Sequence, residues 1–390
     1  ESEEEQPNLK GKLVNKKYVG ISELGNGSYS KVWLIYCPVE NNFFALKIQN
    51  YADTKEAAKE ISFFEDMGKR ECKNVINIKE KFWHQSEFGR HMCMVFPLMG
   101  YSLYDFCKSY LKSNKCFQFE HIMNIFKEIT LSIKEIHKIG IIHTDLKTEN
   151  ILTSKIDDTI ISKIKTIMNL KLNEKYVEKQ KSSNKKNNSI SNLKRIGKII
   201  KNDIESDNES DYYTDVTVTD IEKSKYLLCD FGSAQYSNNI KTNKIQTRYY
   251  RSPESILDAP INNNSDMWSL GCIFYEVLTG DTLFKTNKKE NKITENLTDD
   301  QYHFYQMYSY FGKLPENLID SAKKKDKFFN KDYTFNFIDE STIENKKLSS
   351  TFASHYSKNN VIELLNIIVR TLRYDNNKRI SSEELYNLFD

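Results

Sequence analysis

The sequence predicts an α+β fold in two lobes, a small β-rich lobe followed by a larger helical one. Short runs of β-branched and aromatic residues fill residues 18–48, and apolar residues at helical spacing dominate after residue 100. The chain has 390 residues, of which 39% are hydrophobic, so it is long enough to form two lobes around a shared cleft.

The first lobe is expected to begin with an antiparallel sheet. Its strands are the runs YVGISEL, KVWLIYC and FFALKI, which Gly, Asn and Pro residues separate. A helix should follow over residues 53–67, where Asp53 and Glu56 give a capping-box-like start and Gly68 stands at the expected C-cap. The apolar run MCMVFPLM at 92–99 predicts a further strand.

The second lobe is expected to be helical. Isoleucines at helical spacing run from Phe119 to Lys138, and Gly140 marks the end of that helix. Another helix is expected at about 265–279, again closed by a glycine, Gly280. The resulting division is a tail at 1–10, a first lobe at 11–97, a second lobe at 98–153 and 225–390, and an insertion at 154–224.

The insertion is rich in Lys, Asn and Ser, basic in its first half and acidic in its second. Because such a stretch buries too little apolar surface to offset its ordering entropy, we expect it to be disordered. We expect a role in localisation or partner binding, with Ser206 and Ser210 as sites for an acid-directed kinase. A passive spacer is the alternative.

The composition argues against several classes of protein. A net charge of +3 does not indicate nucleic-acid or membrane-surface binding. Seven cysteines without CxxC pairs favour a reducing compartment over a disulfide framework or a zinc site. The acidic start ESEEEQ does not resemble a signal peptide, and no apolar run approaches membrane-spanning length. We therefore expect a soluble intracellular monomer that contacts neither nucleic acid nor membrane directly.

A glycine-containing segment between two predicted strands is a candidate for phosphate binding. Glycines there let backbone amides approach an anion without interference from side chains. Alone, the segment is better explained as a hairpin turn, but Lys47 on a following strand would supply the cation that nucleotide phosphates need, and Glu60 would hold that lysine. The candidate contact residues in the segment are Leu24, Gly25, Asn26, Gly27 and Ser28.

The strongest motif is the run IHTDLKTENIL, followed downstream by DFG. Phosphoryl transfer to a hydroxyl needs a carboxylate that takes the proton, a cation on the γ-phosphate and oxygen ligands for magnesium. Asp145 and Lys147 would supply the carboxylate and the cation. Asn150 and Asp230 would supply the metal ligands.

Together these motifs make the sequence similar to a protein kinase that uses ATP and Mg²⁺. A GxG or a DFG alone arises by chance, but the ordered set, with SPE and DMWS downstream, does not. The similarity covers nearly all of residues 11–390 except the insertion. It implies that Asp266 braces the catalytic loop and that Glu254 pairs with Arg379. It also implies adenine contacts at Val32, Ala45 and Leu152, a gatekeeper at Phe96 and a hinge of Pro97, Leu98 and Met99.

Further runs resemble the SR-protein kinases of the CMGC group. They are GxLxNxKY from Gly11, MCMVF at 92–96, IQTR at 245–248 and TGDxLF from Thr279, together with the place of the insertion. The resemblance implies phosphorylation of serines in Arg/Ser-rich proteins such as splicing factors, in the cytoplasm and nucleus, without prior phosphorylation of the activation segment. The LAMMER (Clk-type) dual-specificity kinases are the nearest alternative, because they share the His-Thr-Asp loop and DFGSA. A pseudokinase scaffold is the non-enzyme alternative.

An arginine-rich substrate needs carboxylates that pair with guanidinium groups. Asp281 matches a docking acid of the SR-protein kinases by position, although a simple helix-end role fits it equally well, and Glu149 lies beside the expected base. Tyr302 and Ser309 stand about where that family places acidic docking residues. We therefore expect weaker and less processive handling of long Arg-Ser tracts than the family usually shows.

Overall fold

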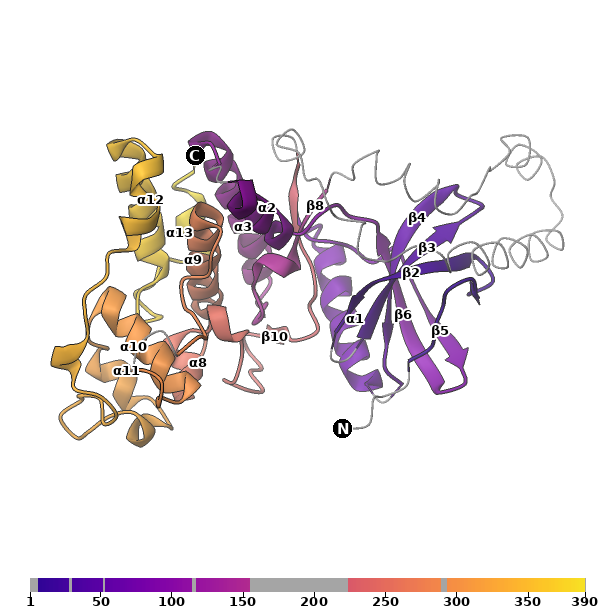
Figure 1. Ribbon diagram of the computed structural model, residues 1–390. Helices are drawn as coiled ribbons and strands as arrows, with labels where there is room; N and C mark the ends of the chain where they lie inside the picture. Colours follow the sequence, from indigo (N-terminus) through magenta and orange to yellow (C-terminus); the bar gives the residue numbers. More distant parts are fainter. Residues whose placement is uncertain are drawn as a thin grey trace. The chain divides into compact units, whose positions relative to one another are not determined.

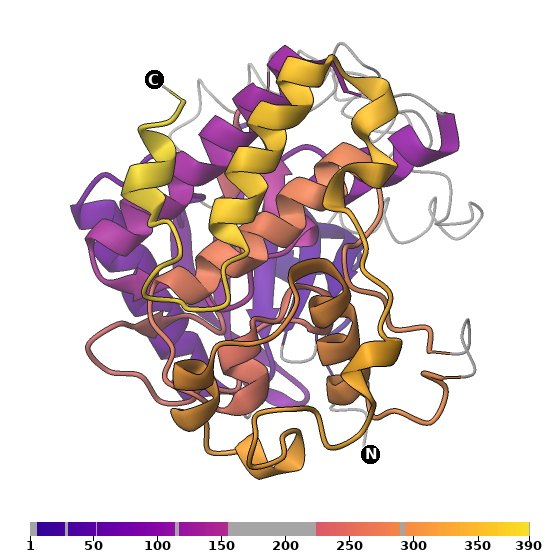
Figure 2. The ribbon, with the colours of Figure 1, turned by 90° about the vertical axis from the view of Figure 1, so that its left-hand side faces the viewer.

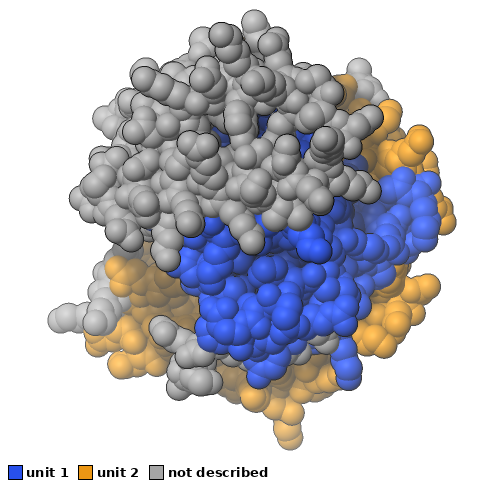
Figure 3. Space-filling model, turned by 90° about the vertical axis from the view of Figure 1, so that its right-hand side faces the viewer, with its two compact units in different colours: residues 1–69, 76–100, 153–224 blue, residues 70–75, 101–152, 225–390 orange. Residues whose placement is uncertain are grey.

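The computed structural model describes residues 6–27, 30–51, 53–113, 117–154, 224–288 and 293–389. Ser28 and all of the expected insertion except Ser154 and Ser224 lie outside the described residues. The described residues form two compact units (Figure 3). The first takes the described parts of 1–69, 76–100 and 153–224, and the second takes those of 70–75, 101–152 and 225–390.

Unit 1 is built on a six-stranded antiparallel sheet in the order β1-β2-β3-β4-β6-β5 (Figure 1). The three predicted runs are confirmed as β2, β3 and β4. Residues 92–97 of the run at 92–99 form the last part of β6, and the remaining two residues follow the strand. The strands are β1 (Leu13–Val14), β2 (Tyr18–Asn26), β3 (Ser30–Cys37), β4 (Asn42–Gln49), β5 (Glu80–Ser86) and β6 (Gly89–Pro97).

The expectation that residues 1–10 form a solvated tail is wrong for the described part of that segment. Leu9 is fully buried in the core of the sheet, and Lys10 bridges Gly20 on β2. A Cβ at Gly20 would lie 2.0 Å from the carbonyl oxygen of Leu9, so only glycine allows this close approach. Burial of Pro7 and Leu9 and the hydrogen bond from the Gly11 N–H to the Gly20 carbonyl hold this segment against the sheet.

Helix α1 (Thr54–Lys69) is the predicted helix of unit 1, but it does not end at Gly68. Gly68 lies inside the helix, and the left-handed residue that follows the helix is Glu71, with φ of 52°. Met67 is fully buried, so packing of the last turn outweighs the helix-ending tendency of the glycine.

Unit 2 is mainly helical (Figure 2). The predicted helix at 119–138 is confirmed to the residue as α3, and the helix expected at about 265–279 is confirmed as α9, with Gly280 in the left-handed conformation after it. The longer helices are α2 (Leu103–Ser113), α3 (Phe119–Lys138), α9 (Asn264–Thr279), α10 (Asp299–Phe311) and α12 (Lys358–Thr371). The shorter ones are α8 (Pro253–Leu257), α11 (Glu316–Asp320) and α13 (Ser382–Tyr386).

Helix α9 forms the centre of unit 2, because its side chains are buried from Ser265 to Leu278. Phe274 of α9 stacks on Phe126 of α3 with 3.7 Å between ring centroids, and α12 runs alongside α9 (Figure 2). None of the helices in the described ranges is long and apolar enough to cross a membrane.

Short strands and 3-10 turns carry the loops of unit 2. They are β7 (Ile141–Ile142), η1 (Thr148–Asn150), β8 (Ile151–Thr153), β9 (Tyr226–Leu228), β10 (Gln235–Tyr236) and η3 (Arg248–Tyr250). Further 3-10 turns are η4 (Lys325–Lys327), η5 (Glu340–Thr342), η6 (Leu348–Thr351) and η7 (Ala353–His355). β7 pairs with β10, and β8 pairs with β9, so the segments around Asp145 and Asp230 are tied together by backbone hydrogen bonds. One such bond joins the Cys229 N–H to the Asn150 carbonyl at 3.0 Å.

Candidate functional site

In unit 1 the structure brings Lys47 and Glu60 together as expected. Lys47 lies on β4 opposite Val32, and its Nζ is 2.7 Å from Oε1 of Glu60 on α1. The other carboxylate oxygen of Glu60 accepts from Gln49 Nε2 at 3.0 Å. Because both oxygens of this buried carboxylate are hydrogen-bonded, the ammonium is held in a defined place, as a phosphate-binding cation requires.

The glycine-containing segment connects β2 and β3. The Gly27 N–H donates to the Ser30 carbonyl at 2.8 Å, and Gly25 lies opposite Val32. A Cβ at Gly25 would meet no atom within 4 Å, so there is open space beside this backbone. Leu24 and Asn26, also at the end of β2, are exposed.

The expected gatekeeper and hinge lie at the end of β6. Phe96 is 7% exposed, pairs with Ala45 of β4 in the sheet and packs against Phe64 of α1 with 5.3 Å between ring centroids. Pro97 ends the strand and is exposed, and Leu98 and Met99 are half-buried. Val32 and Ala45 belong to unit 1 and Leu152 to unit 2, so the adenine contacts stay a prediction.

In unit 2 the carboxylate of Asp145 is held from both sides. Its Oδ2 accepts from Lys147 Nζ at 2.8 Å, and its Oδ1 accepts from the Thr247 hydroxyl at 2.6 Å and the Thr247 N–H at 3.1 Å. The side chain of Asp145 remains 19% exposed. A carboxylate so fixed and still accessible is suited to accept a proton from an incoming hydroxyl.

The pKa of Lys147 is set by opposing effects. Burial lowers the pKa, but the hydrogen bond to Asp145 and the charges of Asp145, Glu149 and Asp230 outweigh burial and raise the pKa above its ordinary value. Lys147 is therefore a stable cation in a group of three carboxylates, which is the condition for stabilising a phosphoryl group there.

The loop around Asp145 is supported by Asp266 of α9, as the resemblance to protein kinases implies. The Asp266 carboxylate accepts from the backbone N–H groups of His143 and Thr144 at 2.8 and 2.9 Å, and it contacts His137 Nε2 at 2.9 Å. Thr144 has φ of 67°, a strained conformation for a non-glycine residue. The buried carboxylate of Asp266 holds that strained backbone in place.

The expected metal ligands fit a hard divalent cation such as Mg²⁺. The amide Nδ2 of Asn150 donates to the Asp145 carbonyl at 2.9 Å, which orients the amide and leaves Oδ1 as its ligand atom. Asp230, in the left-handed conformation with φ of 62°, has an exposed side chain. An amide and a carboxylate oxygen are the ligand types that Mg²⁺ prefers. No cluster of three or more His, Cys, Asp or Glu side chains suited to a metal ion occurs in the part of the chain that the structure describes.

The segment around Thr247 forms a contact with Asp145 that the sequence reasoning missed, because Thr247 was noted there only as part of the run IQTR at 245–248. Gln246, with φ of 70°, accepts two hydrogen bonds at its carbonyl from the Arg251 guanidinium, at 3.0 and 2.8 Å. Its side chain donates to Ser265 and Ser269 of α9 at 2.7 and 2.9 Å. These bonds fix the backbone that presents Thr247 to the base.

A buried carboxylate near the catalytic loop was also missed. Glu276 of α9 is 3% exposed and accepts from the hydroxyls of Tyr250 at 2.7 Å and Thr148 at 3.3 Å. Burial raises the pKa of Glu276 to about 7, and the charge of Glu149 adds to this, while the two hydroxyls oppose it. Thr148 therefore has a structural role that its position in the motif did not indicate.

Asp281, which was considered for substrate docking, and two further acids at the start of α10, Asp299 and Asp300, already have partners. Asp281 forms an ion pair with Lys285, and Asp299 and Asp300 pair with Lys288 and Arg248. Tyr302 and Ser309 are buried in α10. Glu149 is exposed like Asp281 and Asp299, but it differs from them in that no Lys, Arg or His within the described residues forms an ion pair with it.

Glu254 and Arg379 form the predicted ion pair. Both side chains are fully buried, with Nη1 and Nη2 of Arg379 at 2.8 and 3.0 Å from the two carboxylate oxygens. This bidentate pair joins α8 to the loop before α13 and supports the segment after Thr247.

Comparison with known proteins gives a consistent result. Residues 18–167 and 217–388 match the family model of the protein kinase domain. The chain is 28% identical over 389 residues to human "Dual specificity protein kinase CLK4", covering 96% of this chain and 66% of the relative. It is 29% identical over 339 residues to "Serine/threonine-protein kinase SRPK" of Physarum polycephalum, covering 82% and 72%. With "Serine/threonine-protein kinase AFC3" of Arabidopsis thaliana it shares 26% over 385 residues, covering 95% and 81%. The chain thus spans just under two thirds of the human relative's length.

Proposed function

Because the chain belongs to the protein kinase family, we propose that it catalyses ATP-dependent phosphorylation of serine or threonine in other proteins. The observation that carries the proposal is the Asp145 carboxylate, held between Lys147 and Thr247 and still accessible. Lys47, Asn150 and Asp230 are all present, whereas a pseudokinase scaffold would normally lack a phosphate or metal ligand.

In the proposed reaction the γ-phosphoryl group passes from ATP to a substrate hydroxyl oxygen, the hydroxyl proton goes to Asp145, and ADP leaves. Lys147 stabilises the charge on the group in transit, and Lys47 binds the phosphates that remain on ADP. Mg²⁺ held by Asn150 and Asp230 would neutralise phosphate charge when bound.

We further propose serines flanked by arginine as the substrate class, with Glu149 as the principal contact. Glu149 is exposed, and no cationic side chain of the described residues pairs with it, so its carboxylate offers a bidentate site for a guanidinium group next to the target serine. Asp281 is a weaker candidate, because an arginine must first displace Lys285. The resemblance to SR-protein kinases supports this substrate class, and it also supports a location in the cytoplasm and nucleus.

Incubation with labelled ATP and four peptides tests both parts of the proposal. The peptides contain Arg-Ser repeats, proline-directed serines, acidic serine sites or a tyrosine. We expect the highest kcat/KM on the Arg-Ser peptide. Equal rates on arginine-free peptides would reject the substrate class but leave the kinase activity intact, and efficient tyrosine phosphorylation would favour the Clk-type alternative.

The docking residues are tested on the same Arg-Ser peptide. Glu149→Gln should raise its KM several-fold, and Asp281→Ala should raise it less, since one charge-assisted contact is worth about 1 kcal/mol, or fivefold. KM for ATP should not change in either variant. Asp326→Ala, which removes an exposed carboxylate elsewhere in unit 2, is the matched control.

A further inference from the structure

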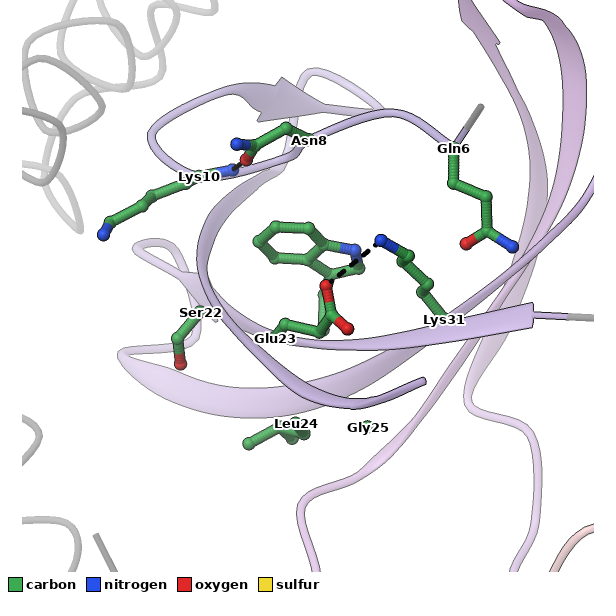
Figure 4. A pocket seen from close by; sticks show the side chains of 9 residues that line it. Gln6, Asn8, Lys10, Ser22, Glu23, Leu24, Gly25 and Lys31 are labelled. Carbon is green, nitrogen blue, oxygen red and sulfur yellow. Dashed lines mark hydrogen bonds and ion pairs between the residues drawn. The ribbon is translucent and has the colours of Figure 1, made fainter. Parts of the chain in front are cut away.

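A cavity of about 510 Å³ lies in unit 1 against β2, β3 and the segment before Gly11 (Figure 4). Its volume is within the range of ligand-binding pockets in proteins. Lys31 and Trp33 of β3 line it and flank Val32 in sequence. Because side chains alternate along a strand, they project from the face opposite Val32, the expected adenine contact. The cavity therefore lies on the other face of the sheet, although Leu24 and Gly25 belong both to its lining and to the expected phosphate-binding segment.

The charged groups of the lining favour an anionic occupant. Lys10 and Lys31 carry positive charge, and Glu23 is the single carboxylate among the lining residues, which leaves a net charge of +1. Lys31 Nζ lies 3.4 Å from the Glu23 carboxylate, but no carboxylate in the described ranges pairs with the Lys10 ammonium. In Figure 4 Lys10 and Gln6 lie on opposite sides of the Lys31–Glu23 pair.

Two buried polar atoms of the lining have no hydrogen-bond partner among the described residues. Trp33 is 4% exposed, and no acceptor in the described ranges meets its Nε1–H. No donor in those ranges meets the amide oxygen of Gln6. Unpaired buried polar groups are costly, so an occupant that accepts from Trp33 and donates to Gln6 gains free energy on binding. Chloride and sulfate accept but cannot donate.

We propose that this cavity binds an acidic segment of a partner protein. Side-chain carboxylates of such a segment pair with Lys10 and Lys31 and accept from the Trp33 N–H, and a peptide N–H donates to Gln6. An acidic peptide carries both kinds of group, and its several carboxylates match the two lysines of the lining. Small rotamer changes of the long lining side chains open the two shielded atoms to the peptide, as is common on binding.

The test is the binding of a fluorescent Glu/Asp-rich peptide to the full chain without ATP, followed by anisotropy. Lys10→Gln should weaken binding about fivefold, the size of a partly exposed ion pair. Glu23→Gln should tighten it by a similar factor, because it removes the competing carboxylate and frees Lys31. Trp33→Phe should weaken binding while keeping the aromatic ring. Lys55→Gln, at an exposed lysine of α1, is the control with the same change in charge.

Opposite effects of Lys10→Gln and Glu23→Gln are diagnostic, since general loss of structure would weaken binding in both. Equal effects of Lys10→Gln and Lys55→Gln, or equal binding of a Gln/Asn peptide, would overturn the proposal.

The chain has its own acidic stretch at 203–211, which lies outside the described residues. If amide substitution of its acids in the full chain raised the affinity for the added peptide fivefold or more, that stretch would be the occupant and the partner assignment would fail. All readouts are independent of kinase activity.

Discussion

At the scale of single residues, the proposed transfer depends on Asp145. Asp145→Asn keeps the size of the side chain but leaves one acceptor oxygen where the carboxylate has two, so it cannot satisfy both Lys147 and Thr247. We expect turnover to fall about 10²–10⁴-fold, as for loss of a general base. ATP binding should be nearly unchanged, because Asp145 contacts no nucleotide in the proposed reaction.

Single-turnover rates and nucleotide titrations of the variant check this expectation. Asp230→Asn is the informative comparison, since loss of a metal ligand should weaken binding of Mg²⁺-ATP and turnover together. An Asp145→Asn enzyme with a tenth or more of the wild-type rate would remove Asp145 from the role of base.

Glu276 gives a prediction for the pH dependence of stability. Its pKa of about 7 in the folded protein lies above the ordinary value of 4.5, so the folded state binds the proton more tightly than the unfolded state. The free energy of unfolding should therefore fall as pH rises from about 4.5 to 7 and level off above, by at most about 3 kcal/mol from this group. The groups facing it are Tyr250, Thr148, Glu149 and Asp281.

Urea denaturation between pH 4.5 and 8 measures this contribution. The glutamine side chain of Glu276→Gln cannot titrate. The free energy of unfolding of this variant should therefore fall less with rising pH than that of the wild type. Glu316→Gln, at another helical glutamate of unit 2, is the comparison that should retain the wild-type pH profile. If the free energy of unfolding depended on pH in the same way in Glu276→Gln and in the wild type, a group other than Glu276 would be responsible for that dependence.

At the scale of secondary-structure elements, two glycines in helix interiors should respond to alanine in opposite directions. A Cβ at Gly68 of α1 would meet no atom within 4 Å, so Gly68→Ala should stabilise by up to about 1 kcal/mol through helix propensity. A Cβ at Gly271 of α9 would lie 2.4 Å from Thr371 Oγ1 and 2.7 Å from Leu372 Cγ. Gly271→Ala should therefore force α9 and α12 apart at a cost of about 1–3 kcal/mol.

Chemical denaturation of the two variants beside the wild type gives both values. Stabilisation by Gly271→Ala would show that α9 and α12 move apart at little cost in free energy. Destabilisation by Gly68→Ala would place that glycine outside a regular helix.

The elements predicted from the residues alone are those set by local pattern, whereas the long-range contacts of Asp266 and of Glu254 with Arg379 were implied by the resemblance to protein kinases. β2, β3, β4, α3 and α9 follow from β-branched runs and helical spacing. β5 was not predicted, because its residues EKFWHQS carry polar side chains on both faces and its pairing with β6 is decided by tertiary structure. The site residues inside short motifs were found for the same reason. The contact of Thr148 with Glu276 joins residues 128 positions apart, and no local spacing indicates it.

At the scale of the whole molecule, contacts between distant parts of the chain hold the catalytic loop. Asp266 connects α9 to the loop before Asp145, and Glu254 meets Arg379 across 125 positions of sequence. The segment around Gln246 is bonded to both the loop and α9, with the Gln246 N–H donating to the Thr144 carbonyl at 2.8 Å. This segment is thus ordered by groups that the chain itself supplies.

This arrangement predicts activity without phosphorylation of the activation segment. In many kinases a phosphate on that segment pairs with an arginine of the catalytic loop, where this chain has Thr144. Here the ordering contacts are already made: Arg248 pairs with Asp300, Arg251 holds the Gln246 carbonyl, and the Thr247 hydroxyl bonds Asp145. A phosphate on Thr247 would place negative charge against the carboxylate of the base, so it should inhibit.

Initial rates before and after phosphatase treatment, on protein made in bacteria, measure this directly. We expect equal rates within about twofold, and Thr247→Glu should lose most of the activity because its carboxylate meets Asp145 at close range. Thr242→Glu carries the same charge on the same segment away from that contact and should stay near wild type. Protein that is silent until a second kinase acts on it would show that the Arg248–Asp300 and Arg251–Gln246 contacts are insufficient to order the segment. Ordering of the activation segment would then require a phosphate in addition to these contacts.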